Sequence, residues 1–91
     1  MKIYKLRHTP TGLYYIPSKG NGNLSTKGKI YSSKPKIEWG LTLRIKLFSF
    51  KKIPTGKHKI ITDYFKLNWN NGSIDRYVKT NVEDWEIIEI N

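Results

Sequence analysis

The chain has 91 residues, no cysteine, 17 Lys and Arg against seven Asp and Glu, and a formal net charge of +10. This length predicts one basic domain over residues 1–91, and the missing thiols exclude disulfides and thiolate metal sites. No stretch reaches the roughly 18 apolar residues that span a bilayer and the first residues are polar, so we expect a cytoplasmic protein without membrane contact.

The positive charge is concentrated in the first two thirds of the chain. Residues 1–59 contain 14 Lys and Arg against the single acid Glu38, a balance of +13, whereas residues 60–91 have a balance of −3. No carboxylate occurs from residue 7 to residue 35. Such a run favours a polyanionic partner, nucleic acid before an acidic protein or an anionic membrane.

The first third of the chain alternates β-forming residues with turn residues. Lys2 to His8 and Leu13 to Ile16 flank Thr-Pro-Thr-Gly at 9–12, a pattern that predicts a β-hairpin. Residues 17–28 are rich in Gly, Asn and Ser, so we expect a loop that Leu24 holds to the core.

Two short elements and one regular strand are predicted next. Lys29 to Ser33 reads as a third strand, and residues 33–39 as one helical turn that Ser33 begins and Gly40 ends. From Leu41 to Leu47, Leu and Ile alternate with polar residues. This period of two predicts a strand with one face in the core and one in solvent.

The last third predicts a hairpin and a final strand. Lys59 to Trp69 and Ile74 to Lys79 flank the turn residues at 70–73, and this register sets Phe65 opposite Val78. After a polar turn, Trp85 to Ile90 again alternates. The elements predict a mainly β domain, or an α+β domain with one short helix, built as a small curled sheet or barrel of about six or seven mostly antiparallel strands.

The sequence contains no motif of an enzyme or a metal site, so we expect a non-enzymatic protein without metal or cofactor. His8 and His58 each stand beside basic residues, and the sequence favours solvated positions on a basic face for both. The alternative is a small metal-independent ribonuclease that uses these imidazoles as general acid and base.

Cations with neighbouring aromatic residues form the pattern that points to a binding function. Single-stranded nucleic acid is held in this way, because cations attract phosphates while aromatic planes stack on bases. Arg44 and Lys46 are expected on the solvent face of the most regular predicted strand. The candidate nucleic-acid-binding residues are Lys5, Arg7, His8, Tyr14, Tyr15, Lys19, Lys27, Lys29, Tyr31, Lys34, Lys36, Arg44 and Lys46.

The aromatic residues divide into two groups. Trp69 and Trp85 alternate with apolar neighbours and are expected in the core. Tyr14, Tyr15 and Tyr31 suit either the core or the binding surface, and at least one of the two adjacent tyrosines should point outward because neighbouring strand residues face opposite ways.

Five short stretches also carry a family resemblance: Arg7 to Tyr15, Asn23 to Ser25, Lys27 to Tyr31, Lys34-Pro35 and Asp84 to Ile87. In these stretches the chain resembles small, mostly uncharacterised basic proteins of tailed, T4-like bacteriophages. The resemblance does not extend over residues 38–79. Small basic phage proteins include inhibitors of host defence, one of which restrains a toxin ribonuclease of an RNA-antitoxin system while associating with RNA. The resemblance implies an accessory protein in the cytoplasm of an infected bacterium.

Together these features predict a phage-type accessory protein that binds RNA or single-stranded nucleic acid and acts as an anti-defence protein or inhibitor of a toxin ribonuclease. One alternative is a protein–protein inhibitor whose basic face blocks an acidic or nucleic-acid-binding site of a bacterial host enzyme. The other is the small ribonuclease.

Overall fold

The computed structural model describes residues 2–18, 20–48, 54–68 and 73–91. These residues form the strands and helices β1 (Ile3–His8), β2 (Leu13–Ser18), β3 (Asn21–Ser25), β4 (Thr42–Phe48), α1 (Lys57–Phe65), β5 (Ser73–Lys79), a 3-10 turn (Val82–Asp84) and β6 (Trp85–Ile90). Among the described residues, the six strands form one sheet in the order β5-β4-β3-β2-β1-β6. Neighbours are antiparallel except for the parallel pair β3 and β4.

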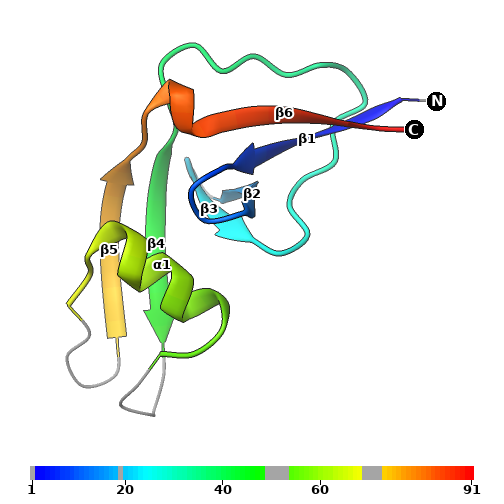
Figure 1. Ribbon diagram of the computed structural model, residues 1–91. Coiled ribbons are helices and arrows are strands. Elements are labelled where there is room, and N and C mark those ends of the chain that lie inside the picture. Colours follow the sequence, from blue (N-terminus) through cyan, green and yellow to red (C-terminus); the bar gives the residue numbers. More distant parts are fainter. Residues whose placement is uncertain (1, 19, 49–53, 69–72) are drawn as a thin grey trace.

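The sheet is curled and open. In Figure 1, β4 and β5 run upright while β1 and β6 lie across them, and both chain termini lie at the far end of the β1–β6 pair. The edge strands β5 and β6 do not pair with each other. The mainly β fold with one short helix is therefore confirmed, and the sheet is a curled one rather than a barrel.

The N-terminal hairpin forms as predicted. His8 pairs with Leu13 across the turn at residues 9–12, and the Gly12 N–H donates to the His8 carbonyl oxygen at 2.8 Å. Gly12 has a φ of 71°, which a residue without Cβ adopts at little cost. This turn fixes the strand that carries Lys5 and Arg7 beside the strand that carries Tyr14.

The predicted loop over residues 17–28 is wrong, because β2 continues to Ser18 and residues 21–25 form β3. Leu24 is in the core as expected, with 1% of its surface exposed. A Cβ added at Gly22 would overlap the Tyr15 ring, so this glycine makes room for an aromatic side chain within a strand. The Gly- and Asn-rich composition therefore reflects close packing on one face and solvent on the other.

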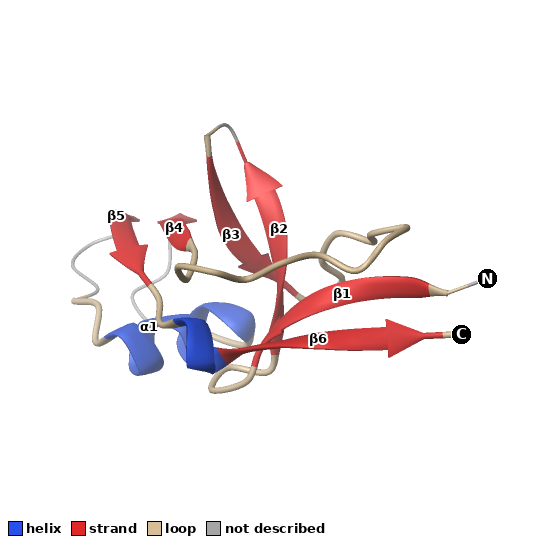
Figure 2. Cartoon of the chain, turned by 90° about the horizontal axis from the view of Figure 1, so that it is seen from above, coloured by secondary structure: helices blue, strands red, loops and turns tan. Residues whose placement is uncertain are grey.

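Residues 26–41, here called the crossover segment, connect the parallel strands β3 and β4. The predicted strand over residues 29–33 is reduced to an isolated bridge, in which Tyr31 and Tyr4 exchange backbone hydrogen bonds of 2.9 and 2.8 Å. The predicted helical turn over residues 33–39 is wrong as well, since this stretch does not form a helix. Figure 2 shows the segment passing over the sheet without regular structure.

β4 is confirmed, but the element after it is a helix. The predicted strand over residues 59–69 is wrong in its described part, where Lys57–Phe65 forms α1. The less exposed positions 58, 61, 62 and 65 follow a helical spacing, and Lys66 ends the helix with a left-handed φ of 53°. β5 consequently pairs with β4, and Val78 lies opposite Leu43 rather than Phe65. Of the predicted turn over residues 70–73, Ser73 instead begins β5, while residues 70–72 and Trp69 lie outside the described residues.

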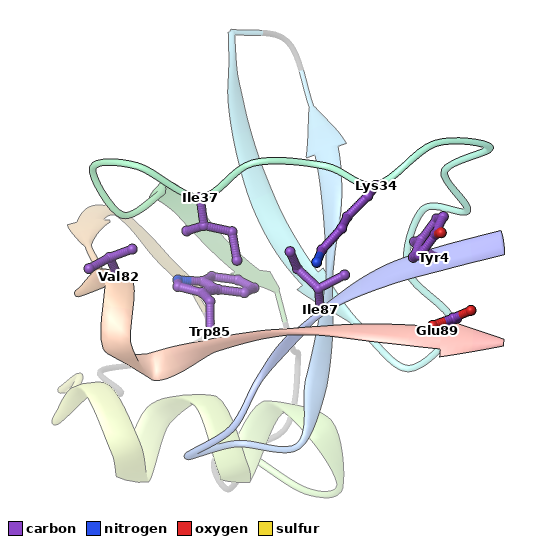
Figure 3. Close-up of a pocket in the computed structure, with 7 residues that line it drawn as sticks. All are labelled: Tyr4, Lys34, Ile37, Val82, Trp85, Ile87 and Glu89. Atoms are coloured by element: carbon purple, nitrogen blue, oxygen red, sulfur yellow. The ribbon is translucent and has the colours of Figure 1, made fainter. Parts of the chain in front are cut away.

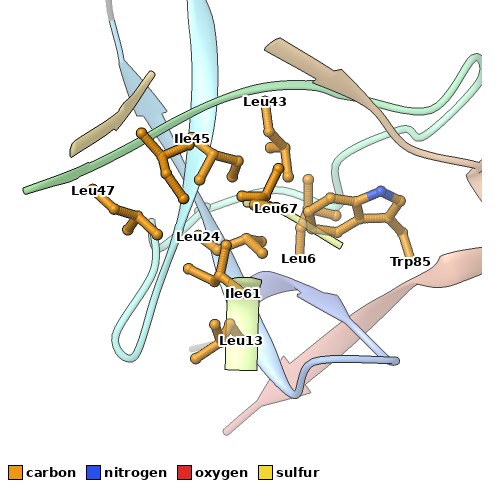
Figure 4. Close-up of a cluster of buried hydrophobic side chains, with 10 residues drawn as sticks. Leu6, Leu13, Leu24, Leu43, Ile45, Leu47, Ile61, Leu67 and Trp85 are labelled. Carbon is orange, nitrogen blue, oxygen red and sulfur yellow. The ribbon is translucent and has the colours of Figure 1, made fainter. Parts of the chain in front are cut away.

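The core lies between α1 and one face of the sheet (Figure 4). Ile61 is the helix residue most deeply buried in it, and Trp85 is in the core as predicted. The buried apolar residues are Leu6, Leu13, Leu24, Leu43, Ile45, Leu47, Ile61, Leu67, Ile74 and Trp85. α1 is short, and the described residues contain no helix long and apolar enough to cross a membrane.

Candidate nucleic-acid interface

The face of the sheet that points away from the core is here called the outer face. Most of the polar strand residues of the sheet lie on it. Alternation along β4 buries Leu43, Ile45 and Leu47 and turns Arg44 and Lys46 outward, as the sequence predicts. The strand pairings extend this face from β1 to β5. The residues on it include Lys5, Arg7, Tyr14, Ile16, Ser18, Asn21, Asn23, Arg44, Lys46, Phe48, Asp75 and Tyr77.

At the β1–β2 end of the outer face, a lysine lies over a tyrosine ring. Lys5 Nζ is 5.1 Å from the centroid of the Tyr14 ring. Arg7 donates from Nη1 to Glu86 Oε1 at 3.1 Å, so its charge is partly neutralised within the chain. The crossover segment lies against this end of the outer face. Gly28 packs so closely on Tyr14 that an added Cβ would overlap the Tyr14 side chain.

At the β4–β5 end, Arg44 is held in a fixed orientation. Its Nε donates to Asp75 Oδ1 at 3.1 Å and its Nη2 to Asp75 Oδ2 at 2.9 Å. These hydrogen bonds lower the pKa of the Asp75 carboxyl and raise that of the Arg44 guanidinium. The guanidinium carbon also lies 5.7 Å from the centroid of the Tyr77 ring on the paired residue of β5. Cation and ring therefore form one preorganised platform.

A second cation and ring lie next to this platform. Lys46 Nζ is 5.1 Å from the centroid of the Phe48 ring. The Phe48 and Tyr77 side chains are exposed by 61% and 58%, which leaves their planes open to a partner. Among the described residues, Lys46 forms no ion pair, so its ammonium group can contact a phosphate.

Between these two ends the outer face is hollowed. A concavity of about 350 Å³ is lined by Ser18, Asn21, Asn23, Arg44 and Lys46. All five side chains bear hydrogen-bonding groups, and two of them are cationic. The concavity can therefore hold a polar or anionic group at the centre of the surface.

The crossover segment places its cations differently. Lys29 Nζ lies 4.9 Å from the centroid of the Tyr31 ring. Lys34 lines a larger hollow of about 440 Å³ that is lined also by Trp85, Ile87 and Glu89 (Figure 3). These β6 residues alternate with Glu86, the partner of Arg7, so the hollow lies on the opposite face of the β1–β6 pair from Arg7.

His8 is not part of a solvated basic face, which corrects the prediction for this residue. None of its surface is exposed, because alternation in β1 turns it into the core among Tyr64, Phe65 and Trp85. Its Nδ1 lies 2.8 Å from Thr11 Oγ1, and its Nε2 has no hydrogen-bond partner in the described part of the chain. Burial lowers the pKa of His8, and the charge of Asp84 partly opposes this shift.

The structure separates the other predicted residues into three groups. Lys5, Arg7, Tyr14, Arg44 and Lys46 share the outer face. Tyr15 and Tyr31 are partly buried against the core, and burial raises the pKa of Tyr31. The crossover segment carries the remaining cations Lys27, Lys29, Lys34 and Lys36. Lys19 lies outside the described residues.

Sequence reasoning missed Ser18, Asn21, Asn23, Phe48 and Tyr77 on the outer face. The two asparagines were assigned to a loop. Tyr77 alternates with Asp75 on the polar side of its strand, a signal that places it outward. Its position beside Arg44 depends on the pairing of β5 with β4, which no local pattern gives.

Comparisons of the chain with protein-family models, curated proteins and solved structures find no match in any of the three.

Proposed function

We propose that the protein binds RNA or single-stranded nucleic acid along the outer face, without turning it over. The observation that carries this proposal is the presence of three cation–ring pairs on one exposed sheet face: Lys5 with Tyr14, Arg44 with Tyr77 and Lys46 with Phe48. Each pair offers a charge for a phosphate beside a plane for a base. The geometry thus supports contacts to both parts of an unpaired nucleotide.

The charge of the chain supports the same partner. A net charge of +10 draws polyanions to the protein, and the release of condensed counterions makes such binding strongly salt-dependent. Stacking on the exposed rings adds affinity for bases that are not already stacked in a duplex. We therefore expect a preference for single strands with low overall sequence preference.

The environment of His8 supports binding without catalysis. A general base must reach the proton that it removes, whereas this imidazole is enclosed by three aromatic rings. His58 lies at the start of α1, while His8 contacts Tyr64 and Phe65 at its end. The two imidazoles therefore do not form an acid–base pair across one site.

The test is a titration of a labelled ten-nucleotide single strand and of its duplex, followed by fluorescence anisotropy between 50 and 200 mM salt. We expect tighter binding of the single strand and, for about five to eight neutralised phosphates, a slope of log K against log salt of roughly −4 to −6. Absence of binding at 50 mM salt, or a flat salt response, contradicts the proposal.

A second measurement separates this function from that of a protein inhibitor with the same surface. A nucleic-acid binder purified from cells at low salt should absorb excessively at 260 nm relative to 280 nm and should lose this excess after a high-salt wash. A protein that lacks the excess and captures a bacterial enzyme instead supports the phage-type inhibitor role.

A further inference from the structure

We infer that the concavity lined by Ser18, Asn21, Asn23, Arg44 and Lys46 is a nucleobase subsite that selects bases with two adjacent hydrogen-bond acceptors, namely guanine and cytosine. This inference rests on the proposed function and specifies what the surface reads. Three features of the lining carry it: the fixed amide of Asn23, the fixed guanidinium of Arg44, and the excess of donors over acceptors.

The oxygen end of the Asn23 side-chain amide is already hydrogen-bonded within its own strand. Its Oδ1 accepts a hydrogen bond of 2.8 Å from the Leu24 N–H. This contact fixes which end of the amide is the oxygen and leaves the two Nδ2 hydrogens for another partner. Asn23 is therefore a donor toward the concavity.

Arg44 is likewise oriented before any ligand arrives. The two hydrogen bonds to Asp75 use the Nε hydrogen and one Nη2 hydrogen. Of the five N–H groups of a guanidinium, two on Nη1 and one on Nη2 remain, and they include the pair that points end-on from the group. Both oxygens of Asp75 are engaged by this contact, and Asp75 is not among the residues that line the concavity.

The remaining lining residues add donors more than acceptors. Lys46 has three N–H donors and no acceptor, while Ser18 and Asn21 can serve in either role. A site rich in donors prefers an edge on which acceptors lie side by side. Guanine has such an edge in O6 and N7, which is the pair that Arg and Lys contact most often in nucleic acids. Cytosine has one in O2 and N3. In adenine the amino group separates N1 from N7 and the C2 hydrogen separates N1 from N3, and in uracil the N3–H separates the two carbonyl oxygens.

The test uses single-stranded RNA 10-mers of uridine with one central nucleotide varied among guanosine, 7-deazaguanosine, cytidine, adenosine and uridine. By anisotropy at constant salt, we expect guanosine and cytidine strands to bind about five- to tenfold more tightly than adenosine and uridine strands. The 7-deazaguanosine strand lacks the N7 acceptor and should bind like the uridine strand.

The informative variant is Arg44→Lys, which keeps the charge and an ion pair to Asp75 but loses the paired N–H edge. We expect it to abolish the base preference and to leave the salt slope unchanged. Arg76→Lys is the matched control, because Arg76 follows Asp75 on β5 and its side chain belongs to the other face of the sheet. The control should keep the full preference.

Each outcome separates the inference from the proposed function. Equal affinity for all five strands with strong salt dependence overturns the base subsite and leaves the proposed function standing. A preference for adenosine or uridine, or a guanosine preference that survives both 7-deaza replacement and Arg44→Lys, also overturns the subsite. Failure of every strand to bind at low salt overturns both.

Discussion

The His8 imidazole and the Trp85 indole lie with their ring centroids 5.0 Å apart in the core, on residues that are direct partners of the β1–β6 pair. The two strands come from opposite ends of the chain, so this contact joins the N-terminal and C-terminal strands at one edge of the open sheet. Trp85 Nε1 donates to Thr80 Oγ1 at 2.7 Å, which satisfies the polar end of the indole. The imidazole is the polar group of this cluster that remains incompletely hydrogen-bonded.

The buried imidazole predicts a pH dependence of stability. Burial lowers the pKa of His8 below its ordinary value of 6.5, so between these two values the unfolded chain binds a proton that the folded chain excludes. Stability is therefore unaffected by His8 above pH 6.5 and falls as the pH drops below it, by up to about 1.4 kcal/mol per pH unit. Urea unfolding measured from pH 8 to pH 5 checks this slope.

The control for this prediction is His8→Gln, which keeps a polar side chain for Thr11 and does not titrate. His58 is present in both proteins, so the difference between their pH profiles isolates His8. The variant should be less stable at pH 8 but should lose less stability on acidification. Parallel profiles for the two proteins would show that His8 is not the group responsible.

Charge reversal distinguishes the outer face from the crossover segment as the binding surface. The variant Lys5→Glu/Lys46→Glu and the variant Lys34→Glu/Lys36→Glu change the charge by the same amount. If the outer face holds the strand, the first variant should reduce the salt slope by about 1.4, because each phosphate contributes about 0.7 for single strands. The second should keep most of its slope, and thermal melting confirms that both proteins fold.

The opposite ranking would move the binding site to the crossover segment, where Lys34 shares a hollow with Glu89. Equal losses in both variants would mean that binding follows net charge without a defined surface. Lys66→Glu supplies a further comparison in the acidic third of the chain, where we expect near-normal binding.

Strands with a strict period of two were predictable because burial alternates directly with sequence. The pattern of Leu43, Ile45 and Leu47 identifies β4 and turns Arg44 and Lys46 outward without any tertiary information. Alternation also placed β6, and turn residues between β-forming stretches placed β1, β2 and β5 approximately. The solvent-facing cations of the candidate interface on β4 could thus be predicted from the sequence.

The elements that were missed have patterns that tertiary packing overrides. Ile60, Ile61, Tyr64 and Phe65 are residues that also form strands, and a short apolar run does not separate a period of two from one of 3.6. In β3, the Tyr15 ring occupies the space that a side chain at position 22 would need. Because residue 22 is glycine, the apolar alternation of this strand lacks one side chain. The position of Tyr77 beside Arg44 was therefore not predicted, because it depends on the pairing of β5 with β4.

Gly40 is predicted to be a sensitive position for the fold. It has a φ of 77°, and an added Cβ would overlap the carbonyl oxygen of Thr80. Gly40→Ala should therefore destabilise the protein by roughly 3 kcal/mol, from backbone strain and the displacement of Thr80 together. Gly20→Ala is the matched control, because Gly20 has a φ of 80° with open space around it and should cost about 1 kcal/mol. Urea unfolding checks both values, and equal costs would contradict a role for the Thr80 contact.

Stacking and charge make separable contributions at the β4–β5 end of the outer face. Tyr77→Leu keeps an apolar side chain but removes the ring that lies beside Arg44, so it should weaken single-strand binding by about 1–3 kcal/mol while leaving the salt slope unchanged. Trp39→Leu removes a ring that is 83% exposed on the crossover segment, and it should leave affinity nearly unaltered. Anisotropy titrations at three salt concentrations measure both quantities. A loss of slope in Tyr77→Leu would show that the ring acts by orienting Arg44 toward a phosphate, and a larger loss in Trp39→Leu would show that bases stack on the crossover segment instead.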